Sequence, residues 1–177
     1  LTGDPRIADD FERSAYNALL ASMLPDGSSF AKYSPLAGIR ALGEIQCDSG
    51  LNCCTANGPR GLLMLPETAV MTAADGVVVN LYGQSTATAA LPAGGRVRVE
   101  QETDYPVSGT IALKLTPDRA RAFALRLRIP AWSERSSVTV NGVPVAEVRP
   151  GEYARIERTW RVGDEVRLEL DLHPRLV

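Results

Sequence analysis

The spacing of apolar residues along the chain changes near residue 75, from a helical period to a strand period. Over residues 6–23 the apolar positions recur at steps of three and four, which is typical of an amphipathic helix. Asp4 and Pro5 supply a start signal, because Asp caps a helix and Pro suits its first position. The Pro-Asp-Gly turn at residues 25–27 predicts where this helix ends.

A second helix is predicted from Asn57 to about Thr72, where leucines, an alanine and a methionine form an apolar face. Pro66 lies within it and marks a place for a kink or an early end. Two helices cannot enclose a hydrophobic core by themselves. Residues 1–74 are therefore expected to be the C-terminal part of a larger helical domain.

Beyond the Asp75-Gly76 turn, apolar and polar residues alternate with a period of two. Arg and Glu alternate with Leu and Val, which indicates strands with one face toward water. Turn residues such as Asn141-Gly142 recur about every ten residues, the spacing of an antiparallel sandwich. We therefore expect a β-sandwich over residues 75–177, with strands at residues 77–82, 96–100, 110–115, 123–129, 137–140, 153–156 and 166–170.

Composition narrows the possible partners and leaves the compartment open. The 177 residues carry a formal net charge of −2, and no basic run is long enough to follow a phosphate backbone. Nucleic acid is not an expected partner. No apolar stretch approaches the roughly 20 residues that span a bilayer, so no membrane span is expected. The sequence begins without an initiator methionine or a signal peptide and reads as a piece of a longer protein, from either the bacterial cytoplasm or a secreted enzyme.

The adjacent pair Cys53-Cys54 is the main candidate for chemistry. Neighbouring cysteines form a disulfide only through a strained ring, and Cys47 is the only other cysteine. The pair precedes the predicted second helix, whose N-terminal partial charge favours a thiolate. Thiolates bind zinc and act as nucleophiles. The alternative is that both residues are small buried hydrophobic side chains.

The run Cys-Cys-Thr-Ala-Asn-Gly-Pro-Arg at residues 53–60 resembles the Cys-Cys-x-x-Asn-x-x-Arg signature of glycoside hydrolase family 127, the β-L-arabinofuranosidase family. In this chain Thr55 and Ala56 stand where the family commonly has two prolines. Other family segments are matched in the same order along the chain, at residues 11–19, 25–27, 33–36, 76–82 and 125–132.

The resemblance implies an α+β multidomain fragment, in which C-terminal helices of an (α/α)6 barrel over residues 1–74 precede the antiparallel β-sandwich. It implies a retaining glycosidase in which Cys53 is the nucleophile, and Cys53 and Cys54 are zinc ligands. The acid/base glutamate and the other zinc ligands would lie upstream, so the isolated chain is expected to be inactive. Cys47 matches no ligand position. The implied partner is a carbohydrate, an L-arabinofuranoside-containing glycan.

The resemblance also implies roles for four other residues. Glu12 falls where the family binds sugar hydroxyls, although a solvated helix carboxylate is the alternative. Tyr33 falls in a loop where an aromatic residue touches substrate, while an ungapped alignment would put Lys32 there. Asn57 and Arg60 match the signature and are expected to support the cysteine loop by hydrogen bonds.

A second reading from another functional class is a non-catalytic module, in which the β-sandwich binds carbohydrate or only packs against a neighbour. The two tryptophans, Trp132 and Trp160, are expected to fill the sandwich core rather than form a sugar-stacking platform. Loss of Cys53 would separate the readings, because it should abolish hydrolysis but leave glycan binding by the sandwich unchanged.

Overall fold

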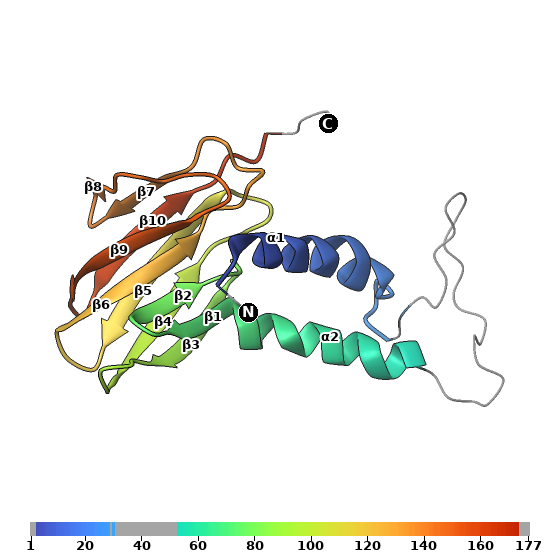
Figure 1. The fold of residues 1–177 in the computed structure, drawn as a ribbon. Helices are drawn as coiled ribbons and strands as arrows, with labels where there is room; N and C mark the ends of the chain where they lie inside the picture. The colour runs from blue at the N-terminus through green and yellow to red at the C-terminus, as the bar shows by residue number, and fades with distance from the viewer. Residues whose placement is uncertain (1–2, 29, 31–52, 174–177) are drawn as a thin grey trace. The chain divides into compact units, whose positions relative to one another are not determined.

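The computed structural model of the chain describes residues 3–28, 30 and 53–173 (Figure 1). The chain forms two compact units, one of Leu1–Asp9 with Thr68–Val177 and one of Asp10–Glu67. All the strands in the described part of the chain belong to the first unit, and most of the described helical residues belong to the second. Compact units within part of a protein need not be its domains, so the domain boundary near residue 75 stays a prediction.

The first predicted helix is present, in two segments. α1 runs over Pro5–Ser14 and continues as the π-helix η1 over Ala15–Leu20. The Asp4 carboxylate accepts a hydrogen bond from the Arg6 backbone N–H at 3.0 Å, as the start signal predicted. The turn that follows is closed by the N–H of Gly27, which donates to the carbonyl of Leu24 at 2.8 Å.

The second helix has different ends from those predicted. α2 spans Cys53–Ala69, so it begins before Asn57 and ends before Thr72, and Pro66 lies inside it without ending it. The last residues of the predicted helix form β1, Val70–Ala73, which pairs with β2 across a tight turn. The apolar pattern of residues 70–73 fits a helix or a strand equally well. Pairing with a neighbouring strand favours the extended form.

Ten strands form two sheets within the described residues (Figure 1). The smaller sheet has the order β1-β2-β6-β9, with β2 at Gly76–Val79, β6 at Arg121–Arg128 and β9 at Tyr153–Trp160. The larger sheet has the order β3-β4-β5-β10-β7-β8. Its strands are β3 Ser85–Ala90, β4 Arg96–Glu102, β5 Thr110–Pro117, β7 Ser137–Val140, β8 Val143–Pro144 and β10 Asp164–Glu169.

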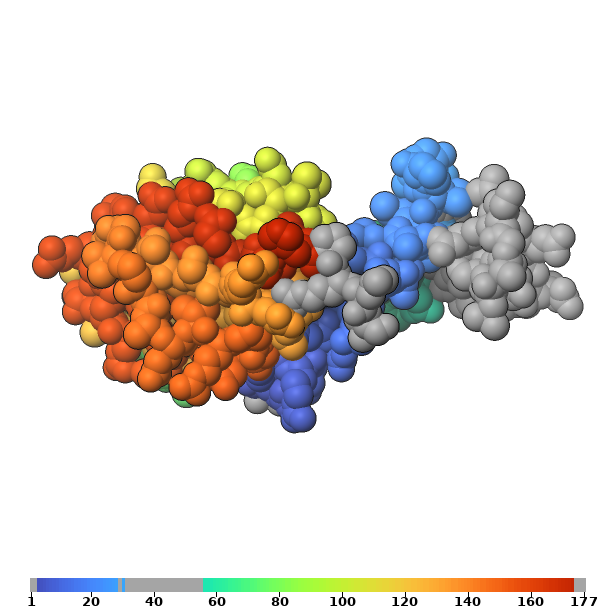
Figure 2. All heavy atoms as spheres, turned by 90° about the horizontal axis from the view of Figure 1, so that it is seen from above, coloured from blue at the N-terminus to red at the C-terminus, as the bar shows by residue number. Residues whose placement is uncertain are grey.

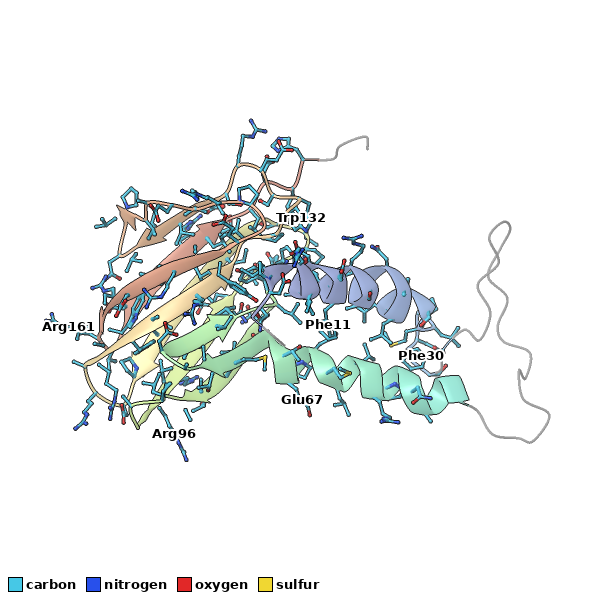
Figure 3. All side chains as sticks on the ribbon, viewed as in Figure 1. Phe11, Phe30, Glu67, Arg96, Trp132 and Arg161 are labelled. Carbon is cyan, nitrogen blue, oxygen red and sulfur yellow. The ribbon has the colours of Figure 1, made fainter. Side chains whose placement is uncertain are left out.

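A single hydrophobic core joins the two sheets, which confirms the sandwich. Inward positions such as Leu113 on β5 and Leu125 on β6 have no exposed surface. Trp160 is also fully buried and donates its indole N–H to the carbonyl of Phe123 at 3.0 Å. Trp132 was expected in this core, but 39% of its surface is exposed (Figure 3). Trp132 lies on a turn beyond the end of β6. The alternation of buried and exposed side chains along a strand therefore does not apply to it.

The sheets depart from the predicted antiparallel pattern in one place. β2 pairs with β6 in parallel, with Val77 opposite Leu125. These strands are far apart in the sequence, so no hairpin turn fixes their relative direction. The other pairings between named strands are antiparallel. In Figure 2 the C-terminal residues, drawn in orange and red, make up much of the visible face of the sandwich. Over the described ranges, no helix is both long and apolar enough to cross a bilayer.

Candidate functional site

Cys53 and Cys54 are the first two residues of α2. The sequence predicted that they lie just before the helix, and the helix in fact includes them. The side chains of both, and all of Cys47, lie outside the described residues, so their roles as nucleophile and zinc ligands stay predictions. Among the side chains that the structure does describe, no group of three or more His, Cys, Asp and Glu could hold a metal ion.

Gly58, which occupies one of the unspecified positions of the signature, has a packing role that the motif alone did not reveal. A Cβ atom added at Gly58 would lie 2.6 Å from two ring carbons of Phe30, which is itself buried (Figure 3). One turn later, a Cβ at Gly61 would lie 3.0 Å from the side chain of Leu19. The two glycines therefore let α2 approach residues from the preceding segment of the same compact unit.

The other two residues of the signature contact each other. Arg60 donates from Nη1 to Oδ1 of Asn57 at 3.3 Å, and both side chains are exposed on α2. The spacing of three residues places them on one side of the helix. Support of the cysteine loop through the backbone stays a prediction.

Glu12 is buried on α1, with 5% of its surface exposed. The alternative of a solvated helix carboxylate is therefore wrong. Arg13, the neighbour considered as its partner, pairs with Asp10 at 3.3 Å. A buried carboxylate needs polar groups that compensate its lost hydration, and the sugar-binding role of Glu12 stays a prediction. Tyr33 and Lys32 lie outside the described residues.

The smaller sheet carries a charged cluster on its outer face that the sequence did not predict. Asp75 accepts hydrogen bonds from both Nη atoms of Arg126 at 2.6 and 2.8 Å, and from Nη2 of Arg155 at 3.1 Å. Burial raises the pKa of Asp75, but hydrogen bonds from Arg155 and the charge of Arg126 outweigh it and hold the pKa below its usual value. The three members of the charged cluster are distant in sequence, so no local sequence motif could have predicted it.

Comparison with known proteins identifies the class. Residues 76–172, more than half of the chain, match the model of the β-L-arabinofuranosidase, GH127 middle domain. The match places the chain among the glycoside hydrolase families. It belongs to glycoside hydrolase family 127, as the resemblance of the cysteine motif predicted.

Several solved structures are similar to this chain over nearly its whole length. A glycoside hydrolase is 32% identical, with a TM-score of 0.80, and the match covers 96% of this chain and 30% of that one. A GH127 β-L-arabinofuranosidase from Geobacillus stearothermophilus T6 is 31% identical, with a TM-score of 0.81 and coverages of 96% and 28%. A GH127 β-arabinofuranosidase is 30% identical, with a TM-score of 0.76 and coverages of 97% and 29%. The chain spans less than a third of the length of these structures, and no curated protein sequence matches it.

Proposed function

We propose that this chain is part of a β-L-arabinofuranosidase that releases an L-arabinofuranosyl unit from a glycan. The observation that carries the proposal is family membership over residues 76–172, together with structural relatives named as enzymes of this activity. The cysteine pair at the first turn of α2 supplies the chemistry, because it matches the family signature. In this proposal α1 and α2 are helices of the (α/α)6 barrel.

Cys53 is the proposed nucleophile. Its sulfur forms a bond to the anomeric carbon while the glycosidic C–O bond breaks, and the departing oxygen takes a proton from a carboxylic acid contributed by a part of the protein outside this chain. The resulting carboxylate then takes a proton from a water molecule as its oxygen attacks the anomeric carbon, and the carbon–sulfur bond breaks to return the Cys53 thiolate. The two displacements retain the configuration of the sugar. The helix N-terminus favours the thiolate form that this attack needs.

Cys53 and Cys54 would also hold a zinc ion. Two adjacent thiols suit zinc by ligand type, but they supply only two of the four ligands of a usual site. In this proposal the remaining ligands come from the part of the protein that precedes this chain. When bound, zinc would keep the sulfur deprotonated at neutral pH.

Four other residues have proposed supporting roles. Glu12, which is buried on α1, would bind sugar hydroxyls, and Tyr33 would contact the sugar from its loop. Asn57 and Arg60 would brace the start of α2 through their mutual hydrogen bond. The carbohydrate partner is an L-arabinofuranoside-containing glycan.

The test is hydrolysis of an aryl β-L-arabinofuranoside by the longer protein that contains this chain. Cys53→Ala should lower kcat by at least about 10³-fold, because the nucleophile is lost. Cys54→Ser should lower the zinc content measured by inductively coupled plasma mass spectrometry. Cys47→Ala is the matched control and should retain both activity and zinc. Equal rates in the Cys53→Ala and Cys47→Ala variants would contradict the assignment.

A further inference from the structure

A hollow of about 460 Å³ lies on the outer face of the smaller sheet, away from the hydrophobic core. Every residue that lines it belongs to the compact unit that contains the sandwich. Its volume lies within the range of about 300–1,000 Å³ that is usual for small-molecule sites.

The floor of the hollow is apolar. Met71 and Ala73 alternate along β1, and Val78 lies on β2 between two core residues, so these three side chains share the outer face. The outer face of a sheet is ordinarily polar where it meets water. An apolar floor on this face therefore offers a surface for the C–H groups of a ligand.

The wall of the hollow is polar and fixed in place. The Tyr153 hydroxyl donates to Oδ1 of Asn80 at 2.7 Å, and Nδ2 of Asn80 donates to the carbonyl of Thr68 at 3.0 Å. Asn80 has only 2% of its surface exposed, so its amide is held rigidly. The phenol oxygen can still accept a hydrogen bond, and the amide nitrogen carries a second N–H. The hydrogen bond to Asn80 thus fixes the Tyr153 hydroxyl in the lining of the hollow, where its oxygen can accept from a ligand hydroxyl.

Arg126 is the charged residue among those that line the hollow. It uses two of its five N–H groups on Asp75, whose carboxylate balances its charge, and it has further donors for a ligand. Asp75 also accepts a hydrogen bond from Arg155, which is not among the lining residues. An arginine that is already paired with a carboxylate favours a neutral ligand rich in hydroxyl groups over an anion or a cation.

We propose that this hollow binds one sugar unit of a neutral glycan. The C–H face of the ring lies on Met71 and Val78, and its hydroxyls contact Tyr153, Asn80 and Arg126. The inference goes beyond the proposed function, because it requires no catalytic residue. Only the choice of arabinose as one of the two probes rests on that function.

The test is isothermal titration of the full chain with an arabino-oligosaccharide and, separately, a cello-oligosaccharide. Saturable binding of either sugar is expected, and the affinity should not change with salt because the ligand is uncharged. Arg126→Ala should weaken binding about tenfold, since charge-assisted hydrogen bonds are lost. Arg167→Ala is the matched control, because this strand arginine also pairs with a carboxylate, Glu169 at 2.6 Å, but lies on the larger sheet.

A second variant covers the case in which loss of Arg126 disturbs the sheet. Ala73→Trp fills the hollow without removing a polar group and should abolish binding while circular dichroism stays unchanged. Hydrogen–deuterium exchange should show sugar-dependent protection in peptides that cover residues 71–80 and 153. Absence of saturable binding by both sugars, or equal weakening by Arg167→Ala, would overturn the site. Hydrolysis by the longer protein is a separate readout, so failure of one proposal leaves the other standing.

Discussion

The carboxylate of Asp9 accepts a hydrogen bond from the guanidinium of Arg128, although the two residues lie 119 positions apart. The Arg128 side chain has no exposed surface, and its Nε donates to the carbonyl of Asn80. The second carboxylate oxygen of Asp9 accepts the backbone N–H of Ala131 at 3.0 Å. This buried ion pair therefore joins the start of α1 to the end of β6 within one compact unit.

Asp9→Asn should destabilise this unit by about 3 kcal/mol, because it leaves a buried guanidinium without its counter-charge. The free energy of unfolding, measured with urea, tests this. Glu157→Gln is the matched control, since its partner Arg155 is exposed, and it should cost less than about 1 kcal/mol. Similar costs for the two variants would mean that burial of Arg128 does not set the strength of its ion pair.

Sequence alternation predicted the strands that carry large apolar residues, such as β5 and β10. It missed β3, Ser85–Ala90, because Ser, Thr and Ala give a weak contrast between the two faces. It also extended the second helix through β1, because the apolar residues there fit either period. Residues 70–73 form a strand because they pair with β2 in a hairpin. This pairing cannot be predicted from the local pattern of apolar residues.

The candidate chemistry was visible in sequence only where it is local. Cys53, Cys54, Asn57 and Arg60 form one short signature, and the family that this signature predicted is confirmed by the match over residues 76–172. The polar wall of the hollow could not be found in this way. Tyr153 and Asn80 lie 73 positions apart. Asn80 directly follows β2 and Tyr153 begins β9, and the two residues meet because both strands belong to one sheet, with β6 between them.

Gly76→Ala should destabilise the sandwich by more than about 2 kcal/mol, through overpacking at the parallel pairing of β2 and β6. A Cβ at Gly76 would lie 1.9 Å from the backbone carbonyl oxygen of Ala124, which cannot swing aside as a side chain can. Thermal unfolding measures the effect. Gly83→Ala, where a Cβ meets nothing within 4 Å, should change the stability by less than about 0.5 kcal/mol. Equal melting temperatures for the two variants would contradict the prediction.

Stability should fall in acid because Asp171 must take up a proton. A hydrogen bond with His173, and a second from Nε of Arg135 at 3.1 Å, hold the pKa of Asp171 well below its usual value. Because the pKa is lower in the folded state, the stabilisation is complete above the unfolded value of 3.8 and is lost as the pH falls below it.

The free energy of unfolding measured from pH 6 to pH 2 tests this contribution. Asp171→Asn should flatten the decline below about pH 4, because the variant has no carboxylate to protonate. Asp104→Asn, which removes an exposed carboxylate, should keep the decline of the parent chain. An unchanged acid decline in the Asp171→Asn variant would show that other carboxylates control it.

Gly58→Ala tests whether the cysteine signature includes a packing requirement. Alanine in an open helix position would gain about 1 kcal/mol over glycine. At Gly58 the added Cβ would meet the buried ring of Phe30 at 2.6 Å, so a net loss of about 1–3 kcal/mol is expected. Gly61→Ala, with a closest approach of 3.0 Å to a flexible leucine, should cost less. Thermal unfolding of the parent chain and of the two variants gives the order of their stabilities.

A double-mutant cycle with Phe30→Ala identifies the cause of that loss. If the clash with the ring is responsible, removal of the ring should relieve it, and Gly58→Ala should then be neutral or stabilising. If the two effects simply add, the glycine is required for another reason. Gly58 lies in the same helix as Cys53 and Cys54, only one turn beyond them. Relief by Phe30→Ala would therefore mean that a contact between α2 and Phe30 constrains the helix that begins with the proposed nucleophile.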